Sequence, residues 1–260
     1  MSRFQLADKV IFITGVAGLL GRVSAKMFLE RGAIVVGSDI IPMSQSKELL
    51  SLQEKFNSDR FYFIQADVSD EDEVKNVFSQ VKEKFGRLDG VFHNAFKQAV
   101  KPFVELTLDE WDEAIKGTLT STFLVNKYAV SMMIPTGGGA IVNTSSVRAQ
   151  VPTARNVAYG SAKAGIHQLT KVVALEHGGH GIRANVLIPG SFMTDEERHG
   201  MGAEKLNIYE RKFALGRAGK AEELSEMAAF LLSDAASYVT ASLFNVDGGY
   251  NLFPAKVSRG

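Results

Sequence analysis

Short runs of β-branched and aromatic residues alternate along the chain with longer segments whose apolar residues recur every three or four positions. The short runs are apolar at nearly every position, as expected for strands that are buried on both faces of a sheet. They span residues 10–14, 34–38, 61–66, 90–93, 140–144 and 184–187. The longer segments have the spacing of amphipathic helices and span residues 24–30, 70–85, 108–133, 156–177 and 221–232. This alternation predicts an α/β fold, with a doubly wound parallel sheet and helices on both faces.

Composition and charge add limits on domains and partners. The 260 residues contain no low-complexity linker, charge block or fixed-period repeat, so we expect one domain over residues 1–260, with the irregular stretch 192–219 as a substrate lid. Lys plus Arg and Asp plus Glu number 29 each, which leaves no overall field to attract nucleic acid or an anionic membrane. The chain has no cysteine, and no apolar run approaches the roughly 20 residues that span a bilayer. We expect a cytoplasmic protein.

A glycine-rich turn follows the first predicted strand and opens the first helix. It contains Gly15, Gly18, Leu19, Leu20 and Gly21. Glycines let backbone amides approach a pyrophosphate closely, and the helix N-terminus adds a favourable dipole. Such a turn is also common as a plain tight connection, but its place between strand and helix favours nucleotide binding.

Asp39 stands at the end of the second predicted strand, 18 residues after Gly21, the last glycine of the turn. Its distance from Gly21 along the chain is near the roughly 20-residue spacing of a ribose-binding carboxylate, which accepts bonds from the ribose hydroxyls and repels a 2′-phosphate. Ile40 and Ile41 follow, so no basic residue is placed to hold that phosphate. The pattern favours NAD over NADP; the alternative for Asp39 is a solvated strand-end carboxylate or cap.

Tyr159 and Lys163 are four residues apart at the start of a long predicted helix, and therefore share one face. A nearby ammonium favours the phenolate of a tyrosine, whose pKa is otherwise about 10. Ser146 follows the fifth predicted strand, where open α/β sheets place their ligands, and its hydroxyl is suited to bond a substrate oxygen. Ser145 competes for that role.

The order and spacing of these residues resemble those of the short-chain dehydrogenases/reductases over residues 8–250. Besides the glycine turn, Ser146 and the Tyr159 segment that follows it, the matching positions are Asp67, Val68, Asn94, Ala95, Pro189, Gly190, Thr194, Val246, Asp247, Gly248 and Gly249. The resemblance implies a single-domain, NAD(P)-binding Rossmann-like fold, and it suggests a homotetramer.

The resemblance also implies a chemistry, hydride transfer between nicotinamide and a carbinol or carbonyl carbon. Tyr159 would pass the proton to or from the substrate oxygen, Ser146 would orient that oxygen, and Lys163 would bind the nicotinamide ribose and lower the pKa of Tyr159. The other matching positions would surround the cofactor: Asp67 and Val68 at the adenine, Asn94 and Ala95 in the cofactor wall, and Pro189, Gly190 and Thr194 at the nicotinamide.

Three positions depart from the family pattern. The middle glycine of the turn is Gly18, one residue before its usual place at Leu19. Thr118 stands where the family carries a catalytic Asn, and its hydroxyl is a candidate to hold the water of a proton relay. Phe96 replaces the usual glycine after the fourth strand, where it shapes the pocket or fills a gap between strand and helix.

These observations predict an NAD(H)-dependent alcohol dehydrogenase or carbonyl reductase, with Phe96, Arg148 and Phe192 near a small-molecule substrate. Sugars, steroids, cyclic alcohols and hydroxy acids all remain open. The alternative is a catalytically weak NAD-binding regulatory or structural protein, suggested by Thr118, Phe96 and the shifted glycine. No metal is expected, because helix-terminal histidines and C-cap glycines explain the two histidines of residues 177–180.

Overall fold

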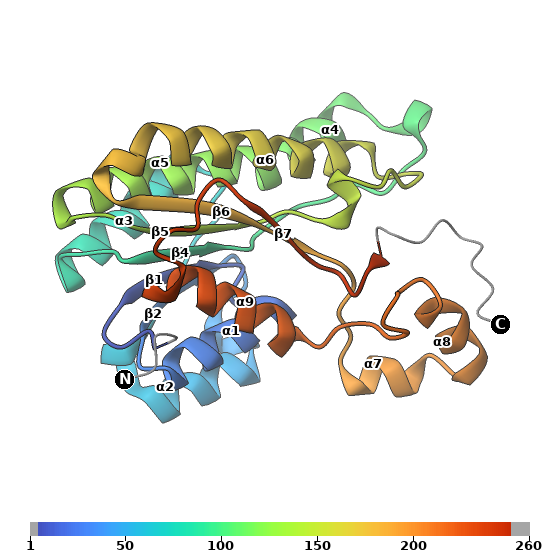
Figure 1. The fold of residues 1–260 in the computed structure, drawn as a ribbon, viewed down its shortest axis with the longest axis horizontal. Coiled ribbons are helices and arrows are strands. Elements are labelled where there is room, and N and C mark those ends of the chain that lie inside the picture. The colour runs from blue at the N-terminus through green and yellow to red at the C-terminus, as the bar shows by residue number, and fades with distance from the viewer. Residues whose placement is uncertain (1–4, 251–260) are drawn as a thin grey trace.

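The computed structural model describes residues 5–250, which form one parallel sheet of seven strands in the order β3-β2-β1-β4-β5-β6-β7 (Figure 1). The strands are β1 (Val10–Thr14), β2 (Ile34–Asp39), β3 (Phe61–Gln65), β4 (Gly90–His93), β5 (Gly139–Thr144), β6 (Ile182–Pro189) and β7 (Leu243–Val246). From β1 the chain builds outward to β3, then returns to place β4 on the other side of β1. Ligands of open α/β sheets bind at the carboxyl ends of the strands beside such a reversal.

Helices cover both faces of the sheet (Figure 1). One layer contains α1 (Leu19–Glu30), α2 (Lys47–Arg60) and α9 (Ala221–Leu232), and the other contains α3 (Glu71–Phe85), α4 (Leu108–Ile115), α5 (Ser121–Met133) and α6 (Val157–His177). Successive strand residues serve opposite cores: in β4, Phe92 packs in the cluster that includes α1 and α9, and Val91 in the cluster that includes α3 and α5. The predicted Rossmann-like fold class is therefore confirmed.

The sequence pattern missed four elements, α2, β7, α7 (Asp195–Gly200) and α8 (Ala203–Glu210). In α2 only Leu49 and Leu52 are buried, and Asn57 interrupts the helix with a φ of 56°. Strand β7 lies at the sheet edge, and none of its residues is fully buried. Weak burial explains why these segments lack a strong hydrophobic period. Helices α7 and α8 follow the carboxyl end of β6, within the predicted lid (Figure 1).

The single helix predicted over residues 108–133 is broken into three parts. A π-helical turn, Lys116–Thr120, separates α4 from α5. Such a turn adds a residue to one helical turn without ending the helix, and it is frequent at functional sites. It places Thr118, which is buried, against the segment that follows β4. No helix within residues 5–250 is long and apolar enough to cross a bilayer.

Candidate active site and cofactor cavity

A cavity of about 520 Å³, here termed the cofactor cavity, opens at the carboxyl ends of β1 to β4. It brings together seven of the residues predicted to bind a cofactor: Gly15, Gly18, Asp39, Asp67, Val68, Asn94 and Ala95. Phe96 also lines it, together with Lys97 from the loop after β4 and Lys116 from the π-helical turn. The cavity thus lies at the reversal point that the sheet order specifies.

Two glycines of the turn after β1 are required by geometry. Gly15 has a φ of 65°, and a Cβ there would lie 3.0 Å from the Ala95 nitrogen. A Cβ on Gly21 would lie 2.1 Å from the Gly15 carbonyl oxygen. Gly18 is the N-cap of α1 with an ordinary φ of −67°, so its shifted position leaves the turn intact. The first-turn amides of a helix, which here start at Leu19, have no intrahelical partner and suit an anion.

Asp39 ties the glycine turn to the end of β2. Its Oδ2 accepts a bond from the Ala17 amide at 2.9 Å, and its Oδ1 accepts one from the Ile41 amide at 3.0 Å. The carboxylate is half-buried and lines the cavity. Because each carboxylate oxygen can accept a further bond, Asp39 keeps acceptor capacity for a ligand hydroxyl.

The end of β4 is fixed by Thr14. Its Oγ1 accepts bonds from the amides of Asn94 at 3.0 Å and Ala95 at 3.1 Å, and lies 2.9 Å from His93 Nδ1. Complete burial, with a smaller contribution from the charge of Lys163, lowers the pKa of His93 to about 3. His93 is therefore neutral at physiological pH and acts as a buried hydrogen-bonding residue that holds the cavity wall.

Asp67 and Val68 form the far wall of the cavity, after β3. The Asp67 amide donates to Glu73 at 2.8 Å, and the Asp67 carboxylate accepts a bond from the Ser69 amide at 2.9 Å. Val68 is buried, whereas Asp67 is exposed. The segment is thus held by its own hydrogen bonds and leaves one carboxylate oxygen of Asp67 toward solvent.

Ser146, Tyr159 and Lys163 meet beyond β5. Burial raises the pKa of Tyr159, and this effect exceeds the lowering by a hydrogen bond with the Ser146 side chain and by the charge of Arg148. The expected lowering of this pKa by Lys163 is not seen. Lys163 is 1% exposed and donates from Nζ to the Thr144 carbonyl at 2.6 Å. Burial lowers the pKa of Lys163 to about 7, so near neutral pH this amine is poised between its charged and neutral forms.

The structure distinguishes the two adjacent serines. Ser145 Oγ donates to the Lys163 carbonyl at 2.9 Å and lies 2.7 Å from His167 Nε2. Its hydroxyl therefore fastens the strand to α6. Ser146 is the serine whose side chain meets Tyr159, and it also accepts a bond from the Arg148 amide at 3.2 Å.

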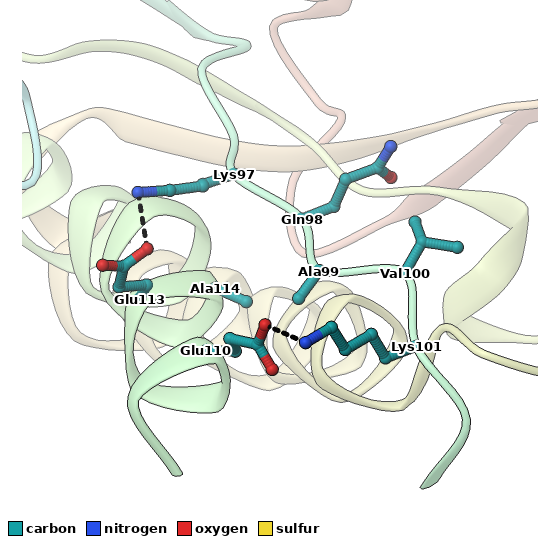
Figure 2. A pocket seen from close by; sticks show the side chains of 8 residues that line it. All are labelled: Lys97, Gln98, Ala99, Val100, Lys101, Glu110, Glu113 and Ala114. Atoms are coloured by element: carbon teal, nitrogen blue, oxygen red, sulfur yellow. Dashed lines mark ion pairs between the residues drawn. The ribbon is translucent and has the colours of Figure 1, made fainter. Parts of the chain in front are cut away.

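Thr118 clasps the loop that follows β4. Its Oγ1 accepts a bond from the Lys97 amide at 3.1 Å and donates to the Lys97 carbonyl at 2.7 Å. Ion pairs reinforce this clasp, with Lys97 at 2.8 Å from Glu113 and Lys101 at 2.5 Å from Glu110. Figure 2 shows these pairs on either side of a cavity of about 260 Å³ between the loop and α4.

Phe96 lies between the cofactor cavity and the catalytic candidates. Its ring centroid is 5.6 Å from that of Tyr159, in an edge-to-face arrangement, and 5.4 Å from Lys163 Nζ. The side chain is 53% exposed, so it does not fill a gap between strand and helix. The sequence marked Phe96 as unusual, but nothing in the sequence indicated its contact with Lys163.

The residues predicted around the nicotinamide lie at the end of β6 and directly after it, outside the cofactor cavity. The Gly190 amide donates to the Val246 carbonyl at 3.0 Å, next to Pro189, the last residue of β6. Thr194 caps α7 through a reciprocal pair of bonds with Glu197. Phe192 lines a separate cavity of about 420 Å³ between the start of the predicted lid and the chain after β7.

Arg148 belongs to another wall, formed by the segment between β5 and α6. Its Nη1 donates to Thr153 Oγ1 and to the Tyr250 hydroxyl, the latter at 3.2 Å. Its guanidinium lies 5.7 Å from the Tyr250 ring centroid. Together with Arg155, it lines a cavity of about 450 Å³. Sequence reasoning missed Tyr250, although an aromatic residue directly after the Gly248 and Gly249 turn was visible.

Comparisons with known proteins cover nearly the whole chain. Residues 15–251 match the family model described as enoyl-(acyl carrier protein) reductase. The chain is 34% identical over 245 residues to cis-4-hydroxycyclohexanecarboxylate dehydrogenase of Sinomonas cyclohexanicum, covering 94% of this chain and 97% of that protein. It is 29% identical over 249 residues to an NAD-dependent glycerol dehydrogenase of Listeria innocua, covering 96% of each. It also resembles the crystal structure of a putative gluconate dehydrogenase from Agrobacterium tumefaciens, with a TM-score of 0.88 at 30% identity, covering 98% of this chain and 100% of that one.

Proposed function

The chain belongs to the short-chain dehydrogenase/reductase family, and we propose that it is an NAD(H)-dependent oxidoreductase that interconverts a secondary alcohol and a carbonyl compound. The observation that carries this proposal is the meeting of Ser146, Tyr159 and Lys163 at the carboxyl edge of the sheet, where Lys163 Nζ lies 5.7 Å from the Tyr159 ring centroid. A protein that only bound the cofactor would have no use for a hydrogen-bonded hydroxyl and phenol beside a buried amine.

The residues of the cofactor cavity fit a dinucleotide. A side chain at Gly21 would collide with the backbone of Gly15, so glycine there lets the turn pack directly against α1. The amides from Leu19 onward would then bond to a pyrophosphate. Asp39 would accept bonds from a ribose diol and repel a 2′-phosphate, and Asp67 with Val68 would hold the adenine. The NAD dependence named for the glycerol dehydrogenase relative supports this choice of cofactor.

We assign the proton transfer to Tyr159. The bound cofactor supplies the hydride chemistry. Ser146 orients the substrate oxygen, and Tyr159 donates or accepts its proton through the phenolic oxygen. Lys163 holds the nicotinamide ribose and, with a pKa of about 7, exchanges a proton near neutral pH. Thr118 acts in this scheme by positioning the loop that carries Phe96.

We place the substrate between the segment after β5 and the predicted lid, residues 192–219. The relatives are named for glycerol and for a hydroxycyclohexane acid, which supports a small polar or cyclic alcohol as substrate. Arg148, two residues after Ser146 in the chain, and Phe192 supply a charged and an apolar contact. Within this scheme the chain works as one domain over residues 1–260.

We also propose a homotetramer. Large apolar side chains are exposed before and at the start of α4, namely Phe103, Val104 and Leu108. Leu175 is exposed on the outer face of α6. Light scattering coupled to size-exclusion chromatography tests this assignment. A monomer at micromolar concentration would contradict it.

The second candidate is a catalytically weak NAD-binding protein, favoured by Phe96 and Thr118 at positions where the family has other residues. Fluorescence titration with NADH and NADPH, followed by a panel of ketones and aldehydes, separates the two. We expect selective NADH binding and its oxidation by a carbonyl compound. The Tyr159→Phe variant should lose turnover but retain NADH binding, whereas Tyr238→Phe, at a fully exposed tyrosine, should change neither. Unchanged turnover in Tyr159→Phe would exclude the proposed mechanism.

A further inference from the structure

Phe96 lines the cofactor cavity and also contacts Tyr159 and Lys163. Asp39 lines the same cavity, whereas Tyr159 and Lys163 are not among its lining residues within residues 5–250. The ring contacts both of them, at 5.6 Å from the Tyr159 ring centroid and 5.4 Å from Lys163 Nζ. The Phe96 residue is therefore part of the cavity wall, and its ring lies against the proton-transfer group.

The backbone on both sides of Phe96 is held in place. The Ala95 amide donates to Thr14 Oγ1, and both backbone groups of Lys97 bond to Thr118 Oγ1. The ring itself is 53% exposed, so core packing does not lock it. Exposed side chains change rotamer within picoseconds to nanoseconds. Phe96 can thus move by rotation of its side chain, without movement of the loop.

The contacts of Phe96 cover groups that have unused bonding capacity. The Lys163 ammonium has three donor hydrogens, and Thr144 provides the one oxygen acceptor that it has within residues 5–250. The face of an aromatic ring attracts an ammonium, and edge-to-face packing adds to this with Tyr159. The closed ring therefore occupies a place where a polar ligand would bond to Lys163.

We propose that Phe96 is a side-chain gate, whose ring shields Lys163 and Tyr159 in the arrangement seen here and turns away to admit the nicotinamide half of the cofactor. The inference rests on the proposed function, because that function assigns Lys163 to the nicotinamide ribose. A gate predicts the direction in which the affinity for the cofactor changes when the ring is removed. Removing the ring removes contacts that compete with the cofactor, so binding becomes tighter; a wall that packs against the bound cofactor would give the opposite sign.

The first measurement is NADH binding by equilibrium titration and stopped-flow fluorescence. An aromatic pair and a cation–π contact together correspond to about a tenfold change in an equilibrium, or about 1.4 kcal/mol. We expect Phe96→Ala to bind NADH about tenfold more tightly, with Phe96→Leu between it and the wild type. The matched control is Phe123→Ala on α5, a side chain that is 50% exposed and does not line the cavity; it should match the wild type. Unchanged or weaker NADH binding by Phe96→Ala overturns the gate.

The second measurement needs no nucleotide. Lys163 is nearly inaccessible, and burial is what lowers its pKa, so exposure raises that pKa toward the ordinary value of 10.5. Labelling with an amine-acylating reagent is therefore carried out at about pH 10, where a buried and an exposed Lys163 both have a large neutral fraction and the rate reports access. Mass spectrometry of the Lys163 peptide should show about tenfold faster labelling in Phe96→Ala than in the wild type or Phe123→Ala. Equal labelling overturns the gate. If no protein in the set binds NADH, the proposed function fails, and the labelling result alone decides whether Phe96 shields Lys163.

Discussion

Replacing Thr118 with valine removes the hydroxyl that bonds both backbone groups of Lys97, while it preserves the branched shape of the side chain. Thr118 is fully buried, and both of its bonds to the Lys97 backbone are partly buried, so the substitution leaves two backbone groups of Lys97 without this partner. Each of the two bonds then contributes about 1 kcal/mol net. We expect Thr118→Val to lower the free energy of unfolding by about 2 kcal/mol, which corresponds to a fall in Tm of roughly 4–8 °C for a domain of this size.

The sharper assay is hydrogen exchange at the Lys97 amide, because this amide donates to Thr118 Oγ1. A loss of about 2 kcal/mol in local stability corresponds to roughly 30-fold faster exchange. Thr118→Ser is the matched control. It keeps the hydroxyl and loses one buried methyl group, at a cost of about 0.8 kcal/mol, so it should lose some stability but keep the protection of Lys97.

The comparison of the two variants separates the clasp from ordinary packing. Slow exchange at Lys97 in Thr118→Val, or equally fast exchange in Thr118→Ser, would refute the assignment of the clasp to the hydroxyl. Thr118→Asn provides a further arm. An amide has a separate donor and acceptor, so we expect the introduced side chain of this variant to bond both backbone groups of Lys97. Exchange at the Lys97 amide should then be as slow as in the wild type, unlike in Thr118→Val.

Other predictions follow from the glycine turn and the buried groups. Gly21→Ala should weaken NADH binding at least tenfold and destabilise the fold by about 1–3 kcal/mol, because its Cβ would lie 2.1 Å from the Gly15 carbonyl oxygen. Gly18→Ala is the control: its Cβ would lie 3.4 Å from the same oxygen, so this variant should bind NADH normally in the same titration. Asp39→Ala should lose about tenfold or more in NADH affinity and reduce the preference over NADPH; an unchanged NADH-to-NADPH ratio would show that Asp39 does not select the cofactor. The pKa of Lys163 is about 7 in the folded protein, against an ordinary value of 10.5. Between pH 7 and 10.5 the unfolded chain therefore binds more protons than the folded one, so the free energy of unfolding rises with pH by up to about 1.4 kcal/mol per pH unit. Urea unfolding from pH 7.5 to 9.5 should show a smaller slope in Lys163→Met than in the wild type, and equal slopes would contradict the lowered pKa.

The central strands were predictable because the parallel sheet is buried on both faces. β1 matches its predicted bounds of residues 10–14, and β4 its predicted bounds of residues 90–93. Helix α9 also matches its predicted range. Two of the four missed elements, α2 and β7, share a different property. Each buries few side chains, so tertiary contacts hold them without leaving a strong period in the sequence.

Within the candidate site, the sequence identified which residues are present but not which way their side chains point. Adjacent residues at a strand end point to opposite sides, so the sequence did not distinguish Ser145 from Ser146. The distinction depends on α6, whose Lys163 carbonyl and His167 ring meet Ser145, whereas Tyr159 meets Ser146.

The π-helical turn shows why the departures at Thr118 and Phe96 belong together. A helical period that continues through residues 108–133 conceals the added residue, and only the fold shows that Thr118 faces Lys97. A hydroxyl there bonds both backbone groups of Lys97, which fixes the chain directly after Phe96. An aromatic ring on a loose loop would shield Lys163 only in part. The backbone next to Phe96 is fixed while its side chain is free to rotate, which is the arrangement that a gate requires. We therefore expect Thr118→Val to speed the labelling of Lys163 even though Phe96 is still present.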